Sequence, residues 1–492
     1  MTETAKKKRG MPSSFTILLA LLAIVAVITV IVSGTSGGAV TAARLSDFCT
    51  APILGFADAL PVCLFVMILG GFLGMMTETG ALDNGIAVLV QKLKGNEIML
   101  VPVLMLIFSL GGTTYGMCEE TVPFYALLAA TMMAAGFDPM VGAATVLLGA
   151  GCGCLGSTVN PFAVGAAVDA LTGVGIEVNQ SIIIGLGAVL WIVTTAMSIV
   201  FVMNYAKKVK ADKGSTILSM QELKDAEEAH GKAASEVHKE VKLTGRQKGV
   251  LIAFAFTFVV MIVGFIPLAD LNKGVANFFD AGAVYDADGN AVVQGWSALI
   301  TGLPIGQWYF DEASTWFFLM AVLIGIIGGL SEKQIVNTFI TGAADMMSVV
   351  LVIALARGIS VLMANTGLDV FVLDAAANAL AGLSGVIFAP MSFLVYFGLS
   401  FLIPSTSGMA TVSMPIMGPL AVKLGFSPEV MVMIFSAAIG VVNLFTPTSG
   451  AIMGGLALAK IEWTTWLKFA LKLIVALSVV CAVILTVACV LL

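Results

Sequence analysis

Long apolar segments follow one another along almost the whole chain, and this pattern limits the folds that the chain can adopt. Each segment has about 20 residues, the length that an α-helix needs to cross the hydrocarbon core of a bilayer. Only 11% of the 492 residues are charged, whereas a soluble domain has about 25%. The sequence therefore predicts an all-α polytopic membrane protein. The predicted crossings are 14–33, 52–77, 138–171, 180–206, 249–267, 313–330, 341–365, 427–460 and 465–490.

Two further apolar regions, 97–134 and 383–422, each consist of two apolar arms around a break rich in Gly, Ser and Thr. We expect each of them to be a re-entrant hairpin that enters and leaves the membrane on one side. Polar breaks also interrupt the crossings 138–171 and 427–460, which are therefore expected to be two interrupted helices. Non-helical backbone at membrane depth is tolerated only where it lines a cavity or is buried in protein.

Positive charges are distributed unevenly between the predicted loops. If the N-terminus is cytoplasmic, the Lys and Arg residues outside the cytoplasmic segments are Arg44, Lys273, Lys423 and Arg357. The positive-inside rule predicts this bias, so we expect a multi-pass protein of the bacterial inner membrane with its N-terminus in the cytoplasm. The net charge of −6 does not indicate a nucleic-acid partner; the expected partners are membrane lipid and a small molecule.

The two halves of the chain resemble each other. The matching pairs, in chain order, are Asp58 with Asp345, Thr79-Gly80 with Thr366-Gly367, TTYGMCEETVP with STSGMATVSMP, GFDP with GFSP, and STVNPF with NLFTPT. The predicted crossings start the second half on the opposite side of the membrane, so the repeats are inverted. This arrangement places substrate sites at the midplane between the halves in many secondary transporters. A channel or a membrane enzyme with the same duplication is the alternative.

The chain therefore divides into three parts. Residues 1–206 form the first inverted repeat, and residues 313–492 form the second. Residues 207–312 connect them through a cytoplasmic linker, the crossing 249–267 and an external loop.

The four polar breaks supply the candidate binding residues, because Ser, Thr and Asn side chains and unwound carbonyls can bind ions and polar groups. For any single break, the alternative is a helix kink or close helix packing. The candidates are Thr113, Thr114, Tyr115, Gly116, Ser157, Thr158, Asn160, Ser405, Thr406, Ser407, Gly408, Asn443, Thr446, Thr448 and Ser449. Pro161 and Pro447 are expected to break their helices, since proline removes a backbone donor. A sodium ion is a candidate ligand near Ser157, Asn160, Asn443 and Thr446.

Glu119 and Glu120 are adjacent acids in an apolar region. Ionisable residues inside a membrane are costly and are functional candidates by default. Consecutive helical residues lie about 100° apart, so one carboxylate is expected to face a cavity while the other is capped. The open roles are to hold a cationic substrate group, to bind sodium or to carry a proton; apart from Na⁺ or H⁺, no cofactor is expected.

Three other charged residues lie in or near the predicted crossings. Asp58 and Asp345 are repeat-equivalent, which favours an architectural role, and Arg357 either neutralises an acid or contacts a substrate carboxylate. An enzyme is not indicated, because the two histidines, His230 and His238, both lie in the polar loop 207–248.

Several motifs together resemble the YfcC family of basic amino acid antiporters, which is grouped with the C4-dicarboxylate anaerobic carriers in the ion-transporter superfamily. They are MPSSF, GGTTYGMCEETVPFY, GCGCLGSTVNPFAVG, IPSTSGMATVSMPIMGPLA and TPTSGAIMGGLALAKI. The resemblance covers nearly the whole chain. It implies a secondary transporter that exchanges arginine-, lysine- or ornithine-like substrates by alternating access.

The resemblance also implies two hairpins, two unwound helices, a scaffold that forms a homodimer and a hairpin domain that moves like an elevator. Carried over by position, Thr113 to Gly116 form the inner hairpin tip and Ser405 to Gly408 the outer tip. The dicarboxylate branch of the superfamily has Ser-Asn-Thr tips, from which this chain departs. A sodium- or proton-coupled transporter of a C4-dicarboxylate or another carboxylate or peptide-like substrate is the alternative function.

Overall fold

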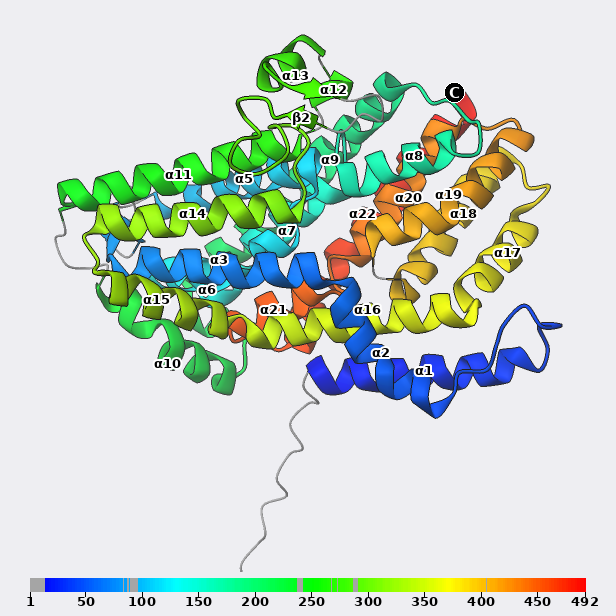
Figure 1. Ribbon diagram of the computed structural model, residues 1–492. Helices are drawn as coiled ribbons and strands as arrows, with labels where there is room; N and C mark the ends of the chain where they lie inside the picture. Colours follow the sequence, from blue (N-terminus) through cyan, green and yellow to red (C-terminus); the bar gives the residue numbers. More distant parts are fainter. Residues whose placement is uncertain are drawn as a thin grey trace, which may run out of the picture.

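The computed structural model describes residues 14–82, 84, 85, 88, 96–236, 242–266, 268–271, 273–285, 291–403 and 405–492. These residues are almost entirely helical (Figure 1). The exception is a two-stranded antiparallel sheet of β1 (Val284–Tyr285) and β2 (Ala291–Val293). The all-α prediction is therefore confirmed, and these two short strands, whose backbone groups pair with each other, are a local exception.

The helices form two series in the same order. The first comprises α1 (Ser14–Ser33), α2 (Leu45–Asp58), α3 (Leu60–Glu78), η1 (Glu97–Met99), α5 (Leu100–Tyr115), η2 (Glu119–Thr121), α6 (Val122–Ala134), α7 (Pro139–Leu155), η3 (Pro161–Gly165), α8 (Ala166–Thr172) and α9 (Gln180–Ala211). The second comprises α14 (Phe310–Gly328), α15 (Glu332–Asp345), α16 (Met347–Thr366), α17 (Leu368–Leu380), α18 (Gly385–Leu402), α19 (Thr406–Lys423), α20 (Pro428–Val442), α21 (Gly450–Leu458) and α22 (Trp463–Leu491).

A connecting region lies between the two series. It comprises η4 (Lys213–Ser215), α10 (Met220–Glu236), α11 (Gly245–Phe265), α12 (Leu268–Leu271), α13 (Lys273–Phe279) and the two strands. The linker is part of the folded structure, because α10 packs against α6.

Eight of the described helices are long and apolar enough to cross a membrane. Each predicted uninterrupted crossing coincides with one of them, but 52–77 and 341–365 contain a helix junction that the sequence did not predict. The first junction separates α2 from α3 at Ala59, two residues before Pro61. Proline lacks the N–H that would continue α2. The second junction separates α15 from α16 at Met346.

The structure confirms the two interrupted helices. Helix α7 ends at Leu155 and helical structure resumes at Pro161, while α20 ends at Val442 and α21 begins at Gly450. Pro161 therefore begins a helical segment rather than kinking one. The first arm of the region 97–134 is itself long enough to span a bilayer, so re-entry of the two hairpins stays a prediction.

The two series pack against each other in a reciprocal way. Helix α2 packs on α16 and α15 on α3, while α6 packs on α21 and α19 on α8; Figure 1 shows α3 and α15 side by side. At the crossings, a Cβ added to Gly55 would collide with the backbone of Gly358, and one added to Gly342 would collide with that of Gly70. Gly55 and Gly342 are equivalent in the repeat alignment, so the close approach recurs in both halves.

Candidate functional site

A cavity of about 180 Å³ lies where the ends of several helices meet. It is lined by the break after α5, by η2, by the breaks that follow α7 and α20, and by the first residues of α19 and α21. The structure brings together part of the predicted set at this cavity: Gly116, Glu119, Glu120, Asn160, Arg357, Ser405, Thr406, Ser407, Asn443, Thr448 and Ser449.

The predicted tip at Thr113 to Gly116 is wrongly placed. Helix α5 continues through Tyr115, and the chain leaves it only at Gly116, which has a left-handed φ of 80°. The Thr113 hydroxyl donates to the Gly156 carbonyl at 2.6 Å, and the Thr114 hydroxyl donates to the Leu110 carbonyl of its own helix at 2.7 Å. The Thr113 hydroxyl joins α5 to the break after α7, and the Thr114 hydroxyl bonds within α5. The alternative of close helix packing therefore holds for this segment.

Other predicted residues form hydrogen bonds within the breaks; Thr158 and Thr446 do not line the cavity, whereas Thr448 does. Thr158 donates to the Thr113 carbonyl at 3.0 Å, and the Thr446 and Thr448 hydroxyls lie 2.7 Å apart. Tyr115 is fully buried and stacks on Phe265 with ring centroids 5.4 Å apart. The remaining predicted residues that do not line the cavity are Ser157, Gly408, Pro161, Pro447, Asp58 and Asp345.

Glu119 and Glu120 form η2, which comes directly before α6, and both line the cavity. Glu120 is 2% exposed, and its carboxylate accepts the Cys118 backbone N–H at 2.9 Å. Glu119 is more exposed, lies beside the Cys118 side chain and lies within electrostatic range of Arg357. The structure thus divides the two roles: Glu120 caps the turn, and Glu119 faces the wall formed by the other half of the chain.

Arg357 lines the cavity from α16, and its Nε lies 2.7 Å from a carboxylate oxygen of Asp58. The pair joins the last residue of α2 to α16, so the architectural role expected for Asp58 includes neutralising this arginine. Asp345 does not share that role, because the residue equivalent to Arg357 in the first repeat is Gly70, which carries no charge. Asp345 and Gly70 both line a second cavity.

Four helical segments present their N-terminal ends to the cavity. They are η2, η3, α19 and α21. Ser405 caps α19 by accepting the Gly408 N–H at 3.1 Å, and Asn160 caps η3 by accepting the Phe162 N–H at 2.9 Å. Ser449 precedes α21 without capping it. Helix N-termini favour negative charge, so the uncapped start of α21 is available to a carboxylate.

The predicted sodium set is brought together only in part. Asn160 and Asn443 line the cavity, whereas Ser157 and Thr446 do not. The Ser157 hydroxyl donates to the Cys154 carbonyl at 2.6 Å and accepts the Asn160 amide at 2.9 Å. Among the described residues, no group of three His, Cys, Asp or Glu side chains is arranged to hold a metal ion.

The sequence analysis missed the residues that support the second break. The indole N–H of Trp463 donates to the Phe445 carbonyl at 2.7 Å, and that of Trp466 donates to the Leu444 carbonyl at 2.9 Å. These carbonyls have lost their helical partners at the end of α20. A buried Trp N–H usually finds a hydrogen-bond partner, and that rule could have directed attention to two tryptophans so soon after a break.

It also missed Ser436, which lines the cavity from α20. Its side chain is 2% exposed, and its hydroxyl has no hydrogen-bond partner among the described residues. An unpaired buried hydroxyl costs free energy, so it is available to a polar group in the cavity. A single serine in an apolar helix does not indicate such a role in the sequence.

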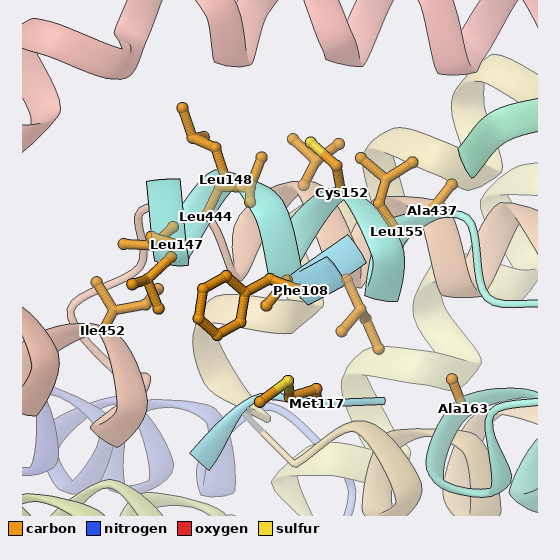
Figure 2. Close-up of a cluster of buried hydrophobic side chains, with 14 of the residues drawn as sticks. Phe108, Met117, Leu147, Leu148, Cys152, Leu155, Ala163, Ala437, Leu444 and Ile452 are labelled. Atoms are coloured by element: carbon orange, nitrogen blue, oxygen red, sulfur yellow. The ribbon is translucent and has the colours of Figure 1, made fainter. Parts of the chain in front are cut away.

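The rest of the wall is apolar. Figure 2 shows Leu147 and Ile452 in the buried cluster that borders the cavity, with Met117 and Ala163 in the same view. Each of the four lines the cavity. A small number of polar groups on a largely apolar wall is typical of small-molecule sites.

Removing the indole donor of Trp466 should weaken the second break. We expect Trp466→Phe to lower the free energy of unfolding by about 1–3 kcal/mol, because the buried Leu444 carbonyl would lose its partner. Trp296→Phe is the matched control. Trp296 donates to the Phe278 carbonyl at 2.7 Å but is 48% exposed, so water can replace it. Thermal unfolding of both purified variants measures the difference; equal stability losses would contradict the role of Trp466.

Two known proteins are similar to this chain in sequence. The chain is 29% identical over 445 residues to an uncharacterized protein of Haemophilus influenzae, covering 90% of this chain and 78% of that one. It is 27% identical over 440 residues to the "Putative basic amino acid antiporter YfcC" of Escherichia coli, covering 87% and 77%.

Two solved structures are similar at low sequence identity. The Alcanivorax borkumensis YdaH transporter matches with a TM-score of 0.46 and 15% identity over 97% of this chain and 98% of that one. The Neisseria gonorrhoeae MtrF structure matches with a TM-score of 0.43 and 16% identity over 98% and 96%.

The family model of the C4-dicarboxylate anaerobic carriers, DcuC, matches residues 40–490. This match spans both series of helices apart from α1, and it includes every residue that lines the cavity. The chain belongs to the DcuC family of membrane transporters.

Proposed function

We propose that this protein is a secondary transporter that exchanges basic amino acids. The observation that carries the proposal is the charge of the cavity. Among the described residues that line it, the formally charged ones are Glu119, Glu120 and Arg357. Arg357 is already paired with Asp58, so the two glutamates leave an excess of negative charge for a cation to neutralise.

The same cavity suits the other end of an amino acid. A carboxylate is stabilised by helix N-termini, and the uncapped start of α21 and the unpaired Ser436 hydroxyl both line the cavity. The α-carboxylate would lie there while the cationic side chain extends toward Glu119. Exchange, rather than uptake, is supported by the name of the E. coli relative and by the resemblance of the motifs.

A sodium- or proton-coupled carrier of a C4-dicarboxylate is the second candidate. The family description and the position of Arg357 in the cavity favour it. In that case Arg357 would leave Asp58 to bind a substrate carboxylate, and a bound Na⁺ or a proton would neutralise the glutamates. Asn160 and Asn443 would supply oxygen ligands for the ion.

Counterflow in proteoliposomes tests the proposal. Vesicles loaded with arginine should accumulate labelled arginine, lysine or ornithine, and should ignore neutral amino acids and C4 acids, with and without sodium. Arg357→Gln separates the two candidates. We expect it to retain arginine exchange under the proposal, since the glutamates and not Arg357 hold the cationic substrate group, and to abolish C4-acid transport under the alternative. A wild-type protein that exchanges C4 acids and not basic amino acids would overturn the proposal.

A further inference from the structure

A second and larger cavity of about 910 Å³ lies on the far side of α6 and α21. Helices α3 and α15 form one of its walls and carry Glu78 and Asp345. The linker helix α10 and the end of α21 form the facing wall with His230 and Lys460. Its lining is rich in charged and hydroxyl side chains, so the cavity is suited to hold water.

The linker helix is fixed to this end of the molecule. The His230 imidazole lies 3.1 Å from the carbonyl of Leu458, the last residue of α21. Glu222 is 3% exposed and accepts the Glu462 N–H at 2.9 Å. Burial lowers the pKa of His230, so the imidazole is neutral at pH 7 and Lys460 is the cation of that wall. By the distribution of Lys and Arg, this is the expected cytoplasmic end.

Three helical elements run from the first cavity to the second. In η2 and α6, Thr121 lines the first cavity and Pro123 the second. Along α16, Ile353 lines the first and Ser348 the second. Along α21, the change occurs between Ile452 and Ala457. Five helical residues rise about 7.5 Å, so the layer between the two cavities is less than two helical turns thick.

This layer is a hydrophobic cluster separate from the main core. Its central residues, which we call the apolar septum, are Cys63, Val66, Val122, Met346, Val349 and Val350, and all are buried. Among the described residues, the side-chain hydrogen bond within it is the weak contact of the Cys63 thiol with the Val350 carbonyl at 3.9 Å. Dispersion and hydrophobic contacts hold the septum together, and these contacts are non-directional.

Helix α21 meets α16 at this layer with glycines. A Cβ added to Gly454 would lie 2.7 Å from a methyl carbon of Val349, and one added to Gly450 would collide with Ile353. The two contacts are one turn apart on each helix. Since α21 has no side chain of its own at either contact, no interlocked pair of side chains resists its displacement along α16.

We propose that the second cavity is the opposite mouth of the transport route, and that the apolar septum is the barrier that separates this mouth from the binding cavity. Substrate would reach the second cavity when α6 and α21 are displaced along α16 and the contacts of the septum break. This inference does not depend on the identity of the substrate, because it rests on the two cavities and the layer between them.

Thiol accessibility tests the inference without any substrate. Ser407→Cys places a thiol in the first cavity and Ser348→Cys places one in the second, each combined with Cys49→Ser to remove the exposed native thiol. A membrane-impermeant thiol reagent is added to right-side-out and inside-out vesicles, and modification is read at each site by mass spectrometry. We expect the two thiols to be modified from opposite faces. Modification of both from the same face alone would overturn the proposal.

Thinning the septum supplies the second measurement. The double variant Val122→Ala and Val349→Ala should make each introduced thiol reactive from both faces, at a rate at least tenfold above that of the intact septum. Val432→Ala is the matched control, because Val432 is equally buried but lies in α20 within the main core. Labelling that stays one-sided in a double variant as stable as the control would show that the septum is not the barrier.

The outcomes of the counterflow and labelling experiments are independent of each other. If basic amino acids are not exchanged but the thiols are modified from opposite faces, the proposed substrate is wrong and the septum stands. If basic amino acids are exchanged but both thiols react from one face, the proposed function stands and the septum does not.

Discussion

Glu119→Gln should weaken arginine binding about 10- to 100-fold while leaving the protein folded. The substitution keeps the size of the side chain and removes its charge. A hydrogen bond to a charged group contributes about 1.5–3 kcal/mol, and each 1.4 kcal/mol is a factor of ten in affinity. Glu119 is expected to carry the larger effect because it is the more exposed of the two carboxylates that line the cavity, whereas Glu120 is buried and occupied by the Cys118 backbone N–H. Isothermal titration of detergent-solubilised protein measures the affinity, and counterflow measures exchange.

Two variants complete this experiment. Glu120→Gln retains an acceptor for the Cys118 N–H, so we expect a smaller loss of affinity. Glu429→Gln is the control for a buried carboxylate outside the cavity: Glu429 is 8% exposed and accepts the Asn179 N–H at 2.7 Å. It should lower stability without changing the affinity for arginine. Normal exchange of basic amino acids by both Glu119→Gln and Glu120→Gln would refute the role of the glutamates.

Hydropathy predicted most of the helices, because every membrane crossing needs about 20 predominantly apolar residues. The predicted crossing 180–206, for example, lies within α9, and the breaks near Pro161 and Pro447 were correctly located. The junctions at Ala59 and Met346 were not predicted, although Asp58 and Asp345 directly precede them, because a single acid changes the mean hydropathy of a long apolar segment too little to divide it. The error at Thr113 has a related cause: Gly and Thr serve both unwound backbone and close helix packing.

Partners far apart in the sequence were the least predictable. The sequence left Arg357 with two roles, and only the fold shows that it meets Asp58 from the other half of the chain. Ser436 and the apolar septum depend likewise on which helices come together. The adjacent glutamates could be singled out, since acids inside an apolar region are costly, but the division of their roles depends on the turn at Cys118.

The repeat gives these details a common basis. Asp58 and Asp345 both end helices that precede a junction, and the helices that follow pack against the opposite half. The two halves differ in the charged groups that line the two cavities. Arg357 faces the first cavity, whereas the equivalent Gly70 leaves Asp345 without that arginine at the second. An architecture shared by the halves can therefore hold a binding cavity on one side of the septum and a wider mouth on the other.

Gly342→Ala should destabilise the protein although alanine is the better helix former. Gly342 lies in α15, where an added Cβ would collide with the Gly70 carbonyl of α3, a backbone atom that cannot move without shifting its helix. Overpacking of this kind costs about 1–3 kcal/mol or more, which exceeds the roughly 0.5–1 kcal/mol that alanine gains over glycine in a helix. Gly398→Ala in α18 is the control, because an added Cβ there meets nothing within 4 Å. We expect the control to raise the melting temperature and Gly342→Ala to lower it.

Gly55→Ala, the repeat-equivalent change against the backbone of Gly358, should repeat the loss. A stabilising effect of either crossing variant would mean that α2, α3, α15 and α16 do not meet through their glycines, and the reciprocal packing of the two halves would lose its support.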